Sequence, residues 1–448
     1  MKITGIEIGD YRQFKNIKFD FTYPEGHPKE GQPLEKVCFI GQSGTGKTTL
    51  LNVIWKLIES LQDWEKFLIN QGYYKLGKEL NSPSSKLYGR ISYTTDFSRQ
   101  SINLAATVLT ELNSNKEFFE ILLTNDEDIE QIANTNNNTK KLGILLKESI
   151  SREADAFLFD QKDQPQTFSD FVKTDTQIEK EKAIHDDRIN TAGSKKVVSL
   201  GDMRSLSIWQ YLLKEINQYD DETVQHITKI VQNTPKSQVA EEIQKWIDSN
   251  PRIDLAEKCL NPILNKFFLE VDTDGGNVPI ALRTRQGVKI NSSYLSTGTR
   301  QLLSTAIPLY KFNTKDTVIL FDEPERSLFP DIQRGLIDYY TSLAPEAQFF
   351  FATHSPIIAS AFEPCERFIL SFNEQGEVEV HSGIAPEGDD PNDILRQDFA
   401  MAELMLQKGL EEYERYRQLA MQIRAETDEK KKNQLIAERL ELGNRYNF

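Results

Sequence analysis

A glycine-rich run near the start of the chain has the residue types and spacing needed to hold a phosphate. It reads Gly41-Gln42-Ser43-Gly44-Thr45-Gly46-Lys47-Thr48-Thr49. Glycines allow successive backbone N–H groups to turn inward around an anion, and the following helix adds about half a positive charge at its N-terminus. The Lys47 ammonium can reach the β- and γ-phosphate oxygens, and the Thr48 hydroxyl can coordinate Mg²⁺. The pattern predicts that these residues bind a nucleoside triphosphate; the alternative is a glycine-rich turn without a ligand.

Two neighbouring acids, Asp322 and Glu323, follow the apolar run 318–321. A carboxylate at the C-terminal end of a parallel strand faces the crevice in which open α/β sheets bind ligands. We expect Asp322 to hold Mg²⁺ through water and Glu323 to act as the general base that polarises the attacking water. Alone, such a pair is also typical of a solvated strand end, and the phosphate loop upstream favours the chemical interpretation.

His354 follows another apolar run, 349–352, and is expected at the same edge of the sheet, near the γ-phosphate. The alternative is a histidine that merely ends a strand. Together with the phosphate loop and the two acids, His354 is predicted to be a catalytic residue.

The segment Ser296-Thr297-Gly298 lies directly before a predicted helix. The exposed N–H groups of a helix N-terminus attract anions, so this turn is a second candidate phosphate site. The alternative is an ordinary helix cap made by Ser296 or Thr297.

Strands and helices that can position these residues are evident in the sequence. The apolar run 37–40 precedes the loop, and apolar spacing predicts a helix over 48–61. The runs 317–321 and 348–352 flank a predicted helix over 331–343. This βαβ pattern predicts a parallel sheet whose carboxyl edge carries the candidate site.

The other elements are less regular. Alternating apolar residues predict strands within the first 23 residues, and residues 62–290 are harder to interpret. Strands are predicted over 87–101, 117–124, 268–271 and 278–290, and helical spacing occurs over 206–216, 224–231 and 255–267. From residue 393 onward the pattern predicts a helical hairpin that breaks at 427–428.

The composition excludes several classes of protein. The 448 residues carry 53 Lys and Arg against 68 Asp and Glu, a net charge of −15, with 38% apolar residues. This balance opposes indiscriminate binding to nucleic acid by the whole surface, although a local basic groove can still bind DNA. No apolar stretch is long enough to span a membrane, and the three cysteines form no disulfide pattern. A cytoplasmic protein without a membrane partner is expected.

Four motifs occur in one order: the phosphate loop, Leu-Ser-x-Gly before a helix, an apolar strand with Asp-Glu, and a strand ending in His. In this the chain resembles the ABC-type ATPases, in the branch that includes RecF and the SMC and Rad50 proteins, over residues 1–60 and 265–365. The resemblance implies two heads related by a two-fold axis that sandwich two ATP molecules with Mg²⁺. Ser296, Thr297 and Gly298 would contact the γ-phosphate bound to the other copy.

The resemblance also assigns roles to residues outside these motifs. Arg12, in Tyr-Arg-Gln-Phe, is similar to the basic residue that follows the first strand in this branch and would contact ATP. Residues 325–330 resemble the D-loop that crosses the dimer interface. Many relatives have a histidine where Phe329 stands, which leaves the local contact open.

A glutamine that contacts the metal is expected after a strand of the first lobe. Gln161 is the best candidate for this Q-loop residue, and Gln100 and Gln164 are rivals.

The predicted fold class is α/β. It combines an ABC-ATPase head, made of an antiparallel β subdomain and a parallel-sheet P-loop core, with a largely helical insertion and a helical C-terminal tail. The expected divisions are residues 1–61 for lobe I, 62–264 for the insertion, 265–385 for lobe II and 386–448 for the tail.

The layout also bears on function. Lys47 and Ser296 lie 249 residues apart, much farther than in transporter ATPase subunits, and the insert has no heptads of a long coiled coil. Only about 80 residues follow Leu370, most of them helical, so a nuclease is expected to be a separate chain. The tail resembles that of ATPase subunits of bacterial anti-phage systems, especially Septu-type systems paired with an HNH nuclease.

These features predict a self-associating ATPase, a dimer or larger ring with slow hydrolysis, that senses infection and regulates a nuclease. The alternative is a DNA repair or recombination ATPase that binds DNA itself, in the manner of RecF. A chaperone-like or translation-linked ATPase usually carries two cassettes, whereas one set of motifs is present here.

Overall fold

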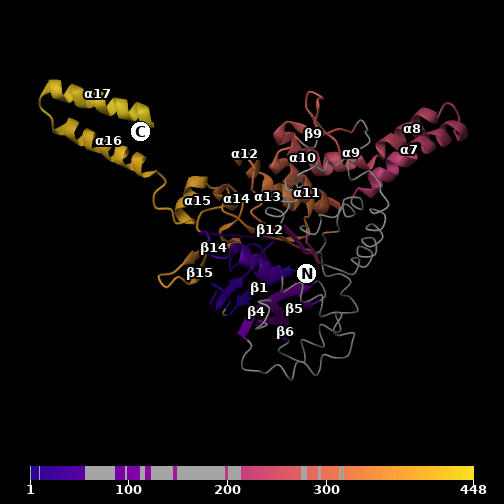
Figure 1. The fold of residues 1–448 in the computed structure, drawn as a ribbon, viewed down its shortest axis with the longest axis horizontal. Coiled ribbons are helices and arrows are strands. Elements are labelled where there is room, and N and C mark those ends of the chain that lie inside the picture. Colours follow the sequence, from indigo (N-terminus) through magenta and orange to yellow (C-terminus); the bar gives the residue numbers. More distant parts are fainter. Residues whose placement is uncertain are drawn as a thin grey trace.

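The computed structural model describes most of the N- and C-terminal parts of the chain and shorter stretches between them. The described residues are 2–9, 11–55, 86–95, 98–110, 117–122, 145–148, 197–199, 213–273, 280–290, 294–311, 314 and 317–448. Figure 1 shows two sheets at the centre, with α11–α13 on one side of them and two helical hairpins that extend outward.

A seven-stranded sheet in the order β15-β14-β3-β13-β12-β7-β8 forms the centre. Its strands are β3 (Lys36–Gly41), β7 (Leu145–Glu148), β8 (Val197–Ser199), β12 (Val318–Asp322), β13 (Gln348–Ala352), β14 (Arg367–Phe372) and β15 (Val378–Ser382). All neighbours pair in parallel except β14 and β15. The predicted parallel sheet is confirmed, while β14, which pairs with the loop-bearing β3, was not predicted.

Both faces of this sheet are buried, which explains the nearly continuous apolar runs of its strands. Side chains alternate between the faces. Phe349 and Phe351 of β13 belong to one core cluster with α11 (Thr297–Lys311) and α13 (Leu336–Leu343), and Phe350 belongs to the other. The predicted helix 331–343 is interrupted, because α12 (Pro330–Gln333) ends before α13 begins.

The second cluster joins the central sheet to an antiparallel sheet in the order β2-β1-β4-β5-β6. Its strands are β1 (Lys2–Ile8), β2 (Ile17–Asp20), β4 (Lys86–Thr95), β5 (Ser98–Thr110) and β6 (Glu117–Leu122). Aromatic rings of Phe19 and Phe21 contact those of Phe39, Phe350 and Phe368. The strand-like pattern predicted over 87–101 is confirmed: it covers most of β4 and the start of β5, which form an antiparallel pair.

Helices and a small sheet precede the segment Ser296-Thr297-Gly298, which is called the signature turn below because the resemblance to ABC-type ATPases predicts that it contacts the other copy's nucleotide. The helices are α7 (Lys214–Asn233), α8 (Val239–Asp248), α9 (Pro251–Leu255), the π-helical turn η4 (Ala256–Leu260), α10 (Asn261–Leu264) and the short turn η5 (Asn265–Phe267). The sheet consists of β9 (Leu269–Val271), β10 (Leu282–Thr284) and β11 (Lys289–Ile290), so the strand expected over 278–290 is a hairpin. The helix predicted over 224–231 is confirmed, yet Val224 and Val231 are exposed and make no core face.

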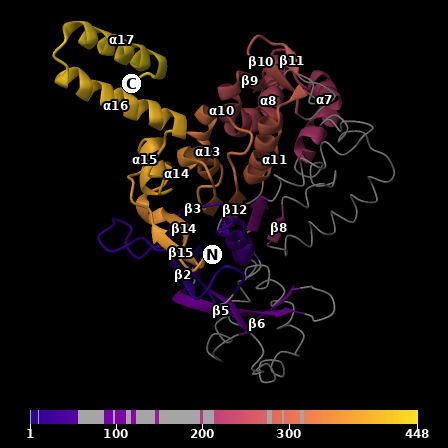
Figure 2. The ribbon, with the colours of Figure 1, turned by 60° about the vertical axis from the view of Figure 1, so that its left-hand side comes forward.

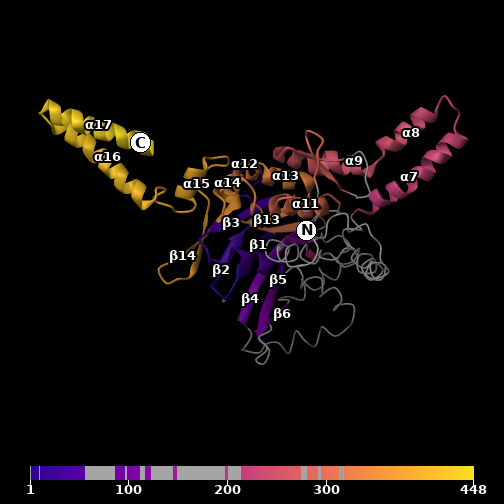
Figure 3. The same cartoon turned by 45° about the horizontal axis from the view of Figure 1, so that its top comes forward.

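The C-terminal residues form α15 (Pro391–Gln397), α16 (Gln407–Ala425) and α17 (Glu429–Tyr446). The break expected at 427–428 is confirmed: the Asp428 side chain caps α17 by accepting hydrogen bonds from the N–H groups of Lys430 and Lys431. Figure 2 shows the α16–α17 hairpin standing clear of the sheets, and in Figure 3 it points away from the α7–α8 hairpin.

A buried ion pair ties the start of this tail to the central sheet. Arg367 of β14 places Nε 2.8 Å from Oδ2 of Asp398, and neither side chain is exposed to solvent. Arg367 also donates to the carbonyl oxygens of Ala359, Phe362 and Ala385. Among the helices of the described ranges, none is long and apolar enough to cross a membrane.

Candidate nucleotide-binding site

The phosphate loop leaves β3 at Gly41 and enters a helix over residues 47–55. Gly41 and Gly46 have φ values of +142° and +95°, which favour glycine. A Cβ at Gly41 would lie 2.0 Å from the carbonyl oxygen of Leu370, and a Cβ at Gly46 would lie 1.9 Å from Nε2 of Gln13. Two of the predicted glycines are therefore required both by conformation and by close neighbours.

Lys47 folds back onto the loop that carries it. Its Nζ donates to the carbonyl oxygens of Gly41 at 2.9 Å and Gln42 at 3.0 Å, and the residue is only 6% exposed. Burial lowers the pKa of Lys47 to about 8, against the opposing effect of the Asp322, Glu323 and Glu325 carboxylates. A buried ammonium that donates to two carbonyl oxygens can also bind an anionic partner, as expected of a lysine that receives a phosphate.

The rest of the loop matches the predicted roles in exposure. Gln42, Ser43, Gly44 and Thr48 are exposed, whereas Thr45 is buried and its hydroxyl donates to the carbonyl oxygen of Gln42 at 2.8 Å. The four exposed residues are thus accessible to a ligand, whereas the buried Thr45 stabilises the turn.

The sheet register brings the two acids to the same edge. Asp322 pairs with Ala352, and Ala352 pairs with Phe39 two residues before Gly41. Glu323 follows with a φ of +53°, in the left-handed region, and its N–H donates to the carbonyl oxygen of Ala352 at 2.7 Å. A non-glycine residue held in this conformation costs about 1 kcal/mol or more, a strain typical of functional sites.

His354 lies just beyond β13, and its side chain is partly solvated. Burial lowers the pKa of His354, the Lys47 charge lowers it further, and Glu323 opposes both. The imidazole is therefore mainly neutral near pH 7. A neutral histidine can donate a hydrogen bond to a phosphate oxygen or to a nucleophilic water without adding a full charge.

One contact at this edge was not predicted. Glu325 accepts two hydrogen bonds through Oε1, from the hydroxyl of Thr353 at 2.6 Å and from the N–H of His354 at 3.1 Å. The sequence signal for it is weak, because a third acid after Asp-Glu-Pro has no fixed spacing rule.

The signature turn lies at the start of α11. The Ser296 hydroxyl accepts a hydrogen bond from the N–H of Thr299 at 3.1 Å, so Ser296 caps the helix and remains exposed. A Cβ at Gly298 would lie 2.5 Å from the carbonyl oxygen of Ser327 and 2.8 Å from Cδ2 of Leu328. The segment predicted to be the signature thus packs directly on the segment predicted to be the D-loop.

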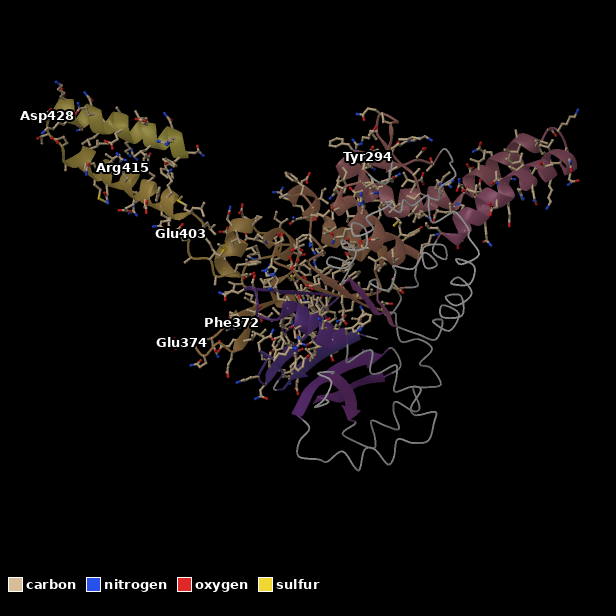
Figure 4. All side chains as sticks on the ribbon, in the orientation of Figure 1. Tyr294, Phe372, Glu374, Glu403, Arg415 and Asp428 are labelled. Carbon is tan, nitrogen blue, oxygen red and sulfur yellow. The ribbon has the colours of Figure 1, made fainter. Side chains whose placement is uncertain are left out.

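Two exposed aromatic side chains flank this contact. Tyr294 is 83% exposed and Phe329 is 71% exposed. Figure 4 shows Tyr294 at the surface of the helical side of the molecule. Large exposed aromatics beside a predicted anion site are typical of a surface that meets another molecule.

The structure gives fewer contacts for the other residues predicted to belong to the site. Arg12 has a φ of +52° and its guanidinium lies 5.2 Å from the ring centroid of Tyr11. The turn that contains Arg12 places Gln13 against Gly46, so Arg12 lies close in sequence to a residue that touches the phosphate loop. Gln161, like Gln164, lies outside the described residues, and for Gln100 only the backbone is described.

Comparison with known proteins groups the chain with ATPases. The family model of the AAA ATPase domain matches residues 1–359. The probable ATPase of retron Vc95 from Vibrio cholerae serotype O1 biovar El Tor is 22% identical over 403 residues, covering 80% of this chain and 71% of that protein.

Solved structures of SMC heads also align with the chain. The SMC head domain from Thermotoga maritima has 12% identity and a TM-score of 0.40, covering 86% of this chain and 100% of that one. The SMC head bound to the C-terminal winged-helix domain of ScpA has 11% identity and a TM-score of 0.41, covering 85% and 97%.

Proposed function

The chain belongs to the AAA ATPase domain family and is an ATP-hydrolysing enzyme, and from this premise we propose that ATP joins two copies of it head to head. We propose further that the joined form, a dimer or a larger ring, regulates a separate nuclease in bacterial anti-phage defence. The similarity to a bacterial retron ATPase and the layout of the tail support this role.

The observation that carries the proposal is the surface around the signature turn. Ser296 is exposed at the N-terminus of the 15-residue helix α11, where N–H groups attract anions. Gly298 packs on the predicted D-loop, and the apolar rings of Tyr294 and Phe329 stand beside them in solvent. A second copy would cover these rings and receive Ser296, Thr297 and Gly298 at the phosphate bound to its own Lys47.

The residues at the edge of the sheet fit ATP with Mg²⁺. The ammonium of Lys47 is buried among carbonyl oxygens with a lowered pKa, which a triphosphate would reverse. Thr48, through its exposed hydroxyl, and Asp322, at the end of β12, are the residues that would hold the metal. When bound, Mg²⁺ neutralises charge on the phosphate oxygens.

The chain's own residues supply the rest of the reaction. Glu323 accepts a proton from the attacking water, and the neutral imidazole of His354 orients that water or the γ-phosphate by a hydrogen bond. Lys47 balances charge on the phosphate oxygens, and the glycine loop supplies N–H donors. We expect hydrolysis to be slow, as in a switch rather than a motor.

The α16–α17 hairpin is the proposed docking segment for the nuclease, for which an HNH type is our candidate. It projects from the head, and Figure 4 marks Arg415 and Asp428 along it. Leu406, Met421 and Leu440 expose more than half of their surface and are accessible to a partner.

Glu323→Gln tests the head-to-head association. This variant is expected to bind ATP without hydrolysing it and to accumulate joined heads, measured as molar mass by light scattering after size-exclusion chromatography. Glu323→Gln/Phe329→Asp is the matched control and is expected to stay monomeric, because a carboxylate replaces a ring at the proposed interface. An unchanged molar mass of Glu323→Gln with saturating ATP would contradict the sandwich.

A further inference from the structure

The turn after β12 is joined to the segment after β13 by a buried carboxyl. Oε1 of Glu325 accepts from the Thr353 hydroxyl at 2.6 Å and from the His354 N–H at 3.1 Å. Oε2 is buried and makes no hydrogen bond within the part of the chain that the structure describes. Glu325 thus forms hydrogen bonds to the backbone of His354, which carries the predicted catalytic imidazole, and to the side chain of the residue before it.

Gln333 of α12 forms a second link between the turn after β12 and the segment after β13. Nε2 of Gln333 donates to the carbonyl oxygen of Leu328 at 2.9 Å, and its Oε1 accepts from the Ser355 hydroxyl at 2.7 Å. Residues 353–355 are therefore held at Thr353, at His354 and at Ser355. All three attachments lead to the turn that begins with Glu323 or to the helix after it.

Burial makes this arrangement costly. The pKa of Glu325 is raised, first because the carboxyl is buried, and also because Glu323 lies nearby; the hydrogen bonds from Thr353 and His354 oppose the shift. A buried carboxyl with one unbonded oxygen destabilises a fold relative to an apolar residue of the same shape. Residues that violate packing rules in this way are expected where function requires them.

We propose that Glu325 is a positioning residue of the ATPase reaction, which holds residues 353–355 so that His354 keeps its place beside the phosphate loop. Glu325 does not touch the reacting atoms and acts through His354. The inference rests on the ATPase activity and is independent of the association of two heads and of any nuclease.

The same turn also contacts the signature helix. Nε2 of Gln301 lies 3.5 Å from the carbonyl oxygen of Pro324, and Gly298 packs on Ser327. The turn that contains Glu325 therefore lies between α11 and the segment that carries His354.

Glu325→Leu tests the proposal. It removes both hydrogen bonds while keeping most of the volume, so we expect kcat to fall about 10- to 100-fold, the effect of a misplaced catalytic group. KM for ATP should change less than about threefold, and Tm should stay equal or rise because the buried carboxyl is gone. Amide hydrogen exchange of residues 353–355 should become faster, and this readout needs no turnover.

Two conservative variants complete the test. Glu325→Gln keeps an acceptor oxygen and should restore most of the activity that Leu loses, with slow amide exchange at 353–355. Thr353→Val removes one of the two bonds and should lower kcat less than Glu325→Leu, and the double variant Glu325→Leu/Thr353→Val should be no worse than Glu325→Leu alone.

A matched control is offered by Glu366, a second buried carboxyl at the opposite end of the sheet. Glu366→Gln is expected to leave kcat within about twofold. The proposal is overturned if Glu325→Leu keeps the wild-type kcat, or if it loses activity only in proportion to a lower Tm. It is also overturned if Glu325→Gln is as inactive as Glu325→Leu, since the charge and not the position of His354 would then matter. Loss of ATP-induced association with these kinetics intact would reject only the proposed sandwich.

Discussion

Two lysines lie near opposite ends of the strand β3, the half-buried Lys36 and the buried Lys47, and their charges are paired in different ways. Lys36, at the amino end, forms ion pairs with Glu387 at 3.0 Å and Glu366 at 3.6 Å and donates to the carbonyl oxygen of Ala361 at 2.6 Å. Lys47, past the carboxyl end, donates to two carbonyl oxygens of its own loop.

The pKa shifts express the difference. The pKa of Lys36 is raised by Glu366 and Glu387, although burial alone would lower it. The pKa of Lys47 is lowered to about 8 because burial outweighs the carboxylates nearby. A lysine whose charge is satisfied within the fold stabilises the fold, whereas a buried lysine with an under-satisfied charge is prepared for a ligand. The comparison predicts that the two residues fail in different assays.

The largest expected effect is on nucleotide binding. Lys47→Ala removes a charged hydrogen bond to phosphate, and ATP affinity should fall about 100-fold or more, measured by isothermal titration calorimetry. Its free energy of unfolding should change by less than about 1 kcal/mol. Retained affinity would remove the assignment of the phosphate loop.

Lys36→Met should show the reverse. It leaves the buried Glu366 carboxyl without its cation, so we expect a loss of about 2–4 kcal/mol in the free energy of unfolding at pH 7.5, measured by urea denaturation. ATP affinity should remain within about twofold. Lys36→Met/Glu366→Gln should recover part of the loss, and a failure to recover any of it would assign the effect to packing of the lysine stem.

The lowered pKa of Lys47 predicts a pH dependence of binding in the nucleotide-free protein. The ammonium is charged below about pH 8 and loses its proton above it, so ATP affinity should be highest below pH 8 and fall up to about tenfold by pH 9. Lys47→Arg is the control because arginine stays charged, and its weaker affinity should be flat over this range. Parallel profiles for the two proteins would contradict the assignment.

The smallest effect concerns stability at the other end. Burial raises the pKa of Glu366 to about 7, against the attraction of Lys36. A carboxyl with a raised folded-state pKa contributes stability below the unfolded pKa of about 4.5 and loses it as pH rises toward 7. Relative to Glu366→Gln, the wild type should therefore lose about 1–3 kcal/mol between pH 4.5 and pH 7.5 in urea denaturation series. A constant difference would show that Lys36 keeps this carboxyl ionised throughout.

The elements around the phosphate loop were predictable because each depends on local pattern. A strand buried on both faces needs an unbroken apolar run, and both β12 and β13 have one followed directly by polar residues. The loop is fixed by its glycines, and the capping position of Asp428 marks the tail hairpin. In these places, neighbours in sequence determine the structure.

Features that depend on partners distant in sequence were not predicted. β14 begins with Arg367, and a charged residue is not expected in a buried strand. In the fold its charge is paired with Asp398, which lies 31 residues later in the sequence. The role of Glu325 depends on Thr353, 28 residues later. The apolar spacing at positions 224, 227, 230 and 231 predicted a helix, and of these four residues only Ile230 is buried. Sequence pattern indicates a helix there without indicating what covers it.

The buried ion pair between Arg367 and Asp398 has a mechanical consequence. Asp398 follows α15 and precedes the linker to the hairpin, while Arg367 begins the strand whose Leu370 carbonyl fills the space beside Gly41. The linker to the hairpin is thus anchored on β14, and the immediate neighbour of β14 is β3, the strand that carries the glycine loop. A molecule bound to the tail would thus be connected to the glycine loop through one ion pair and two neighbouring strands.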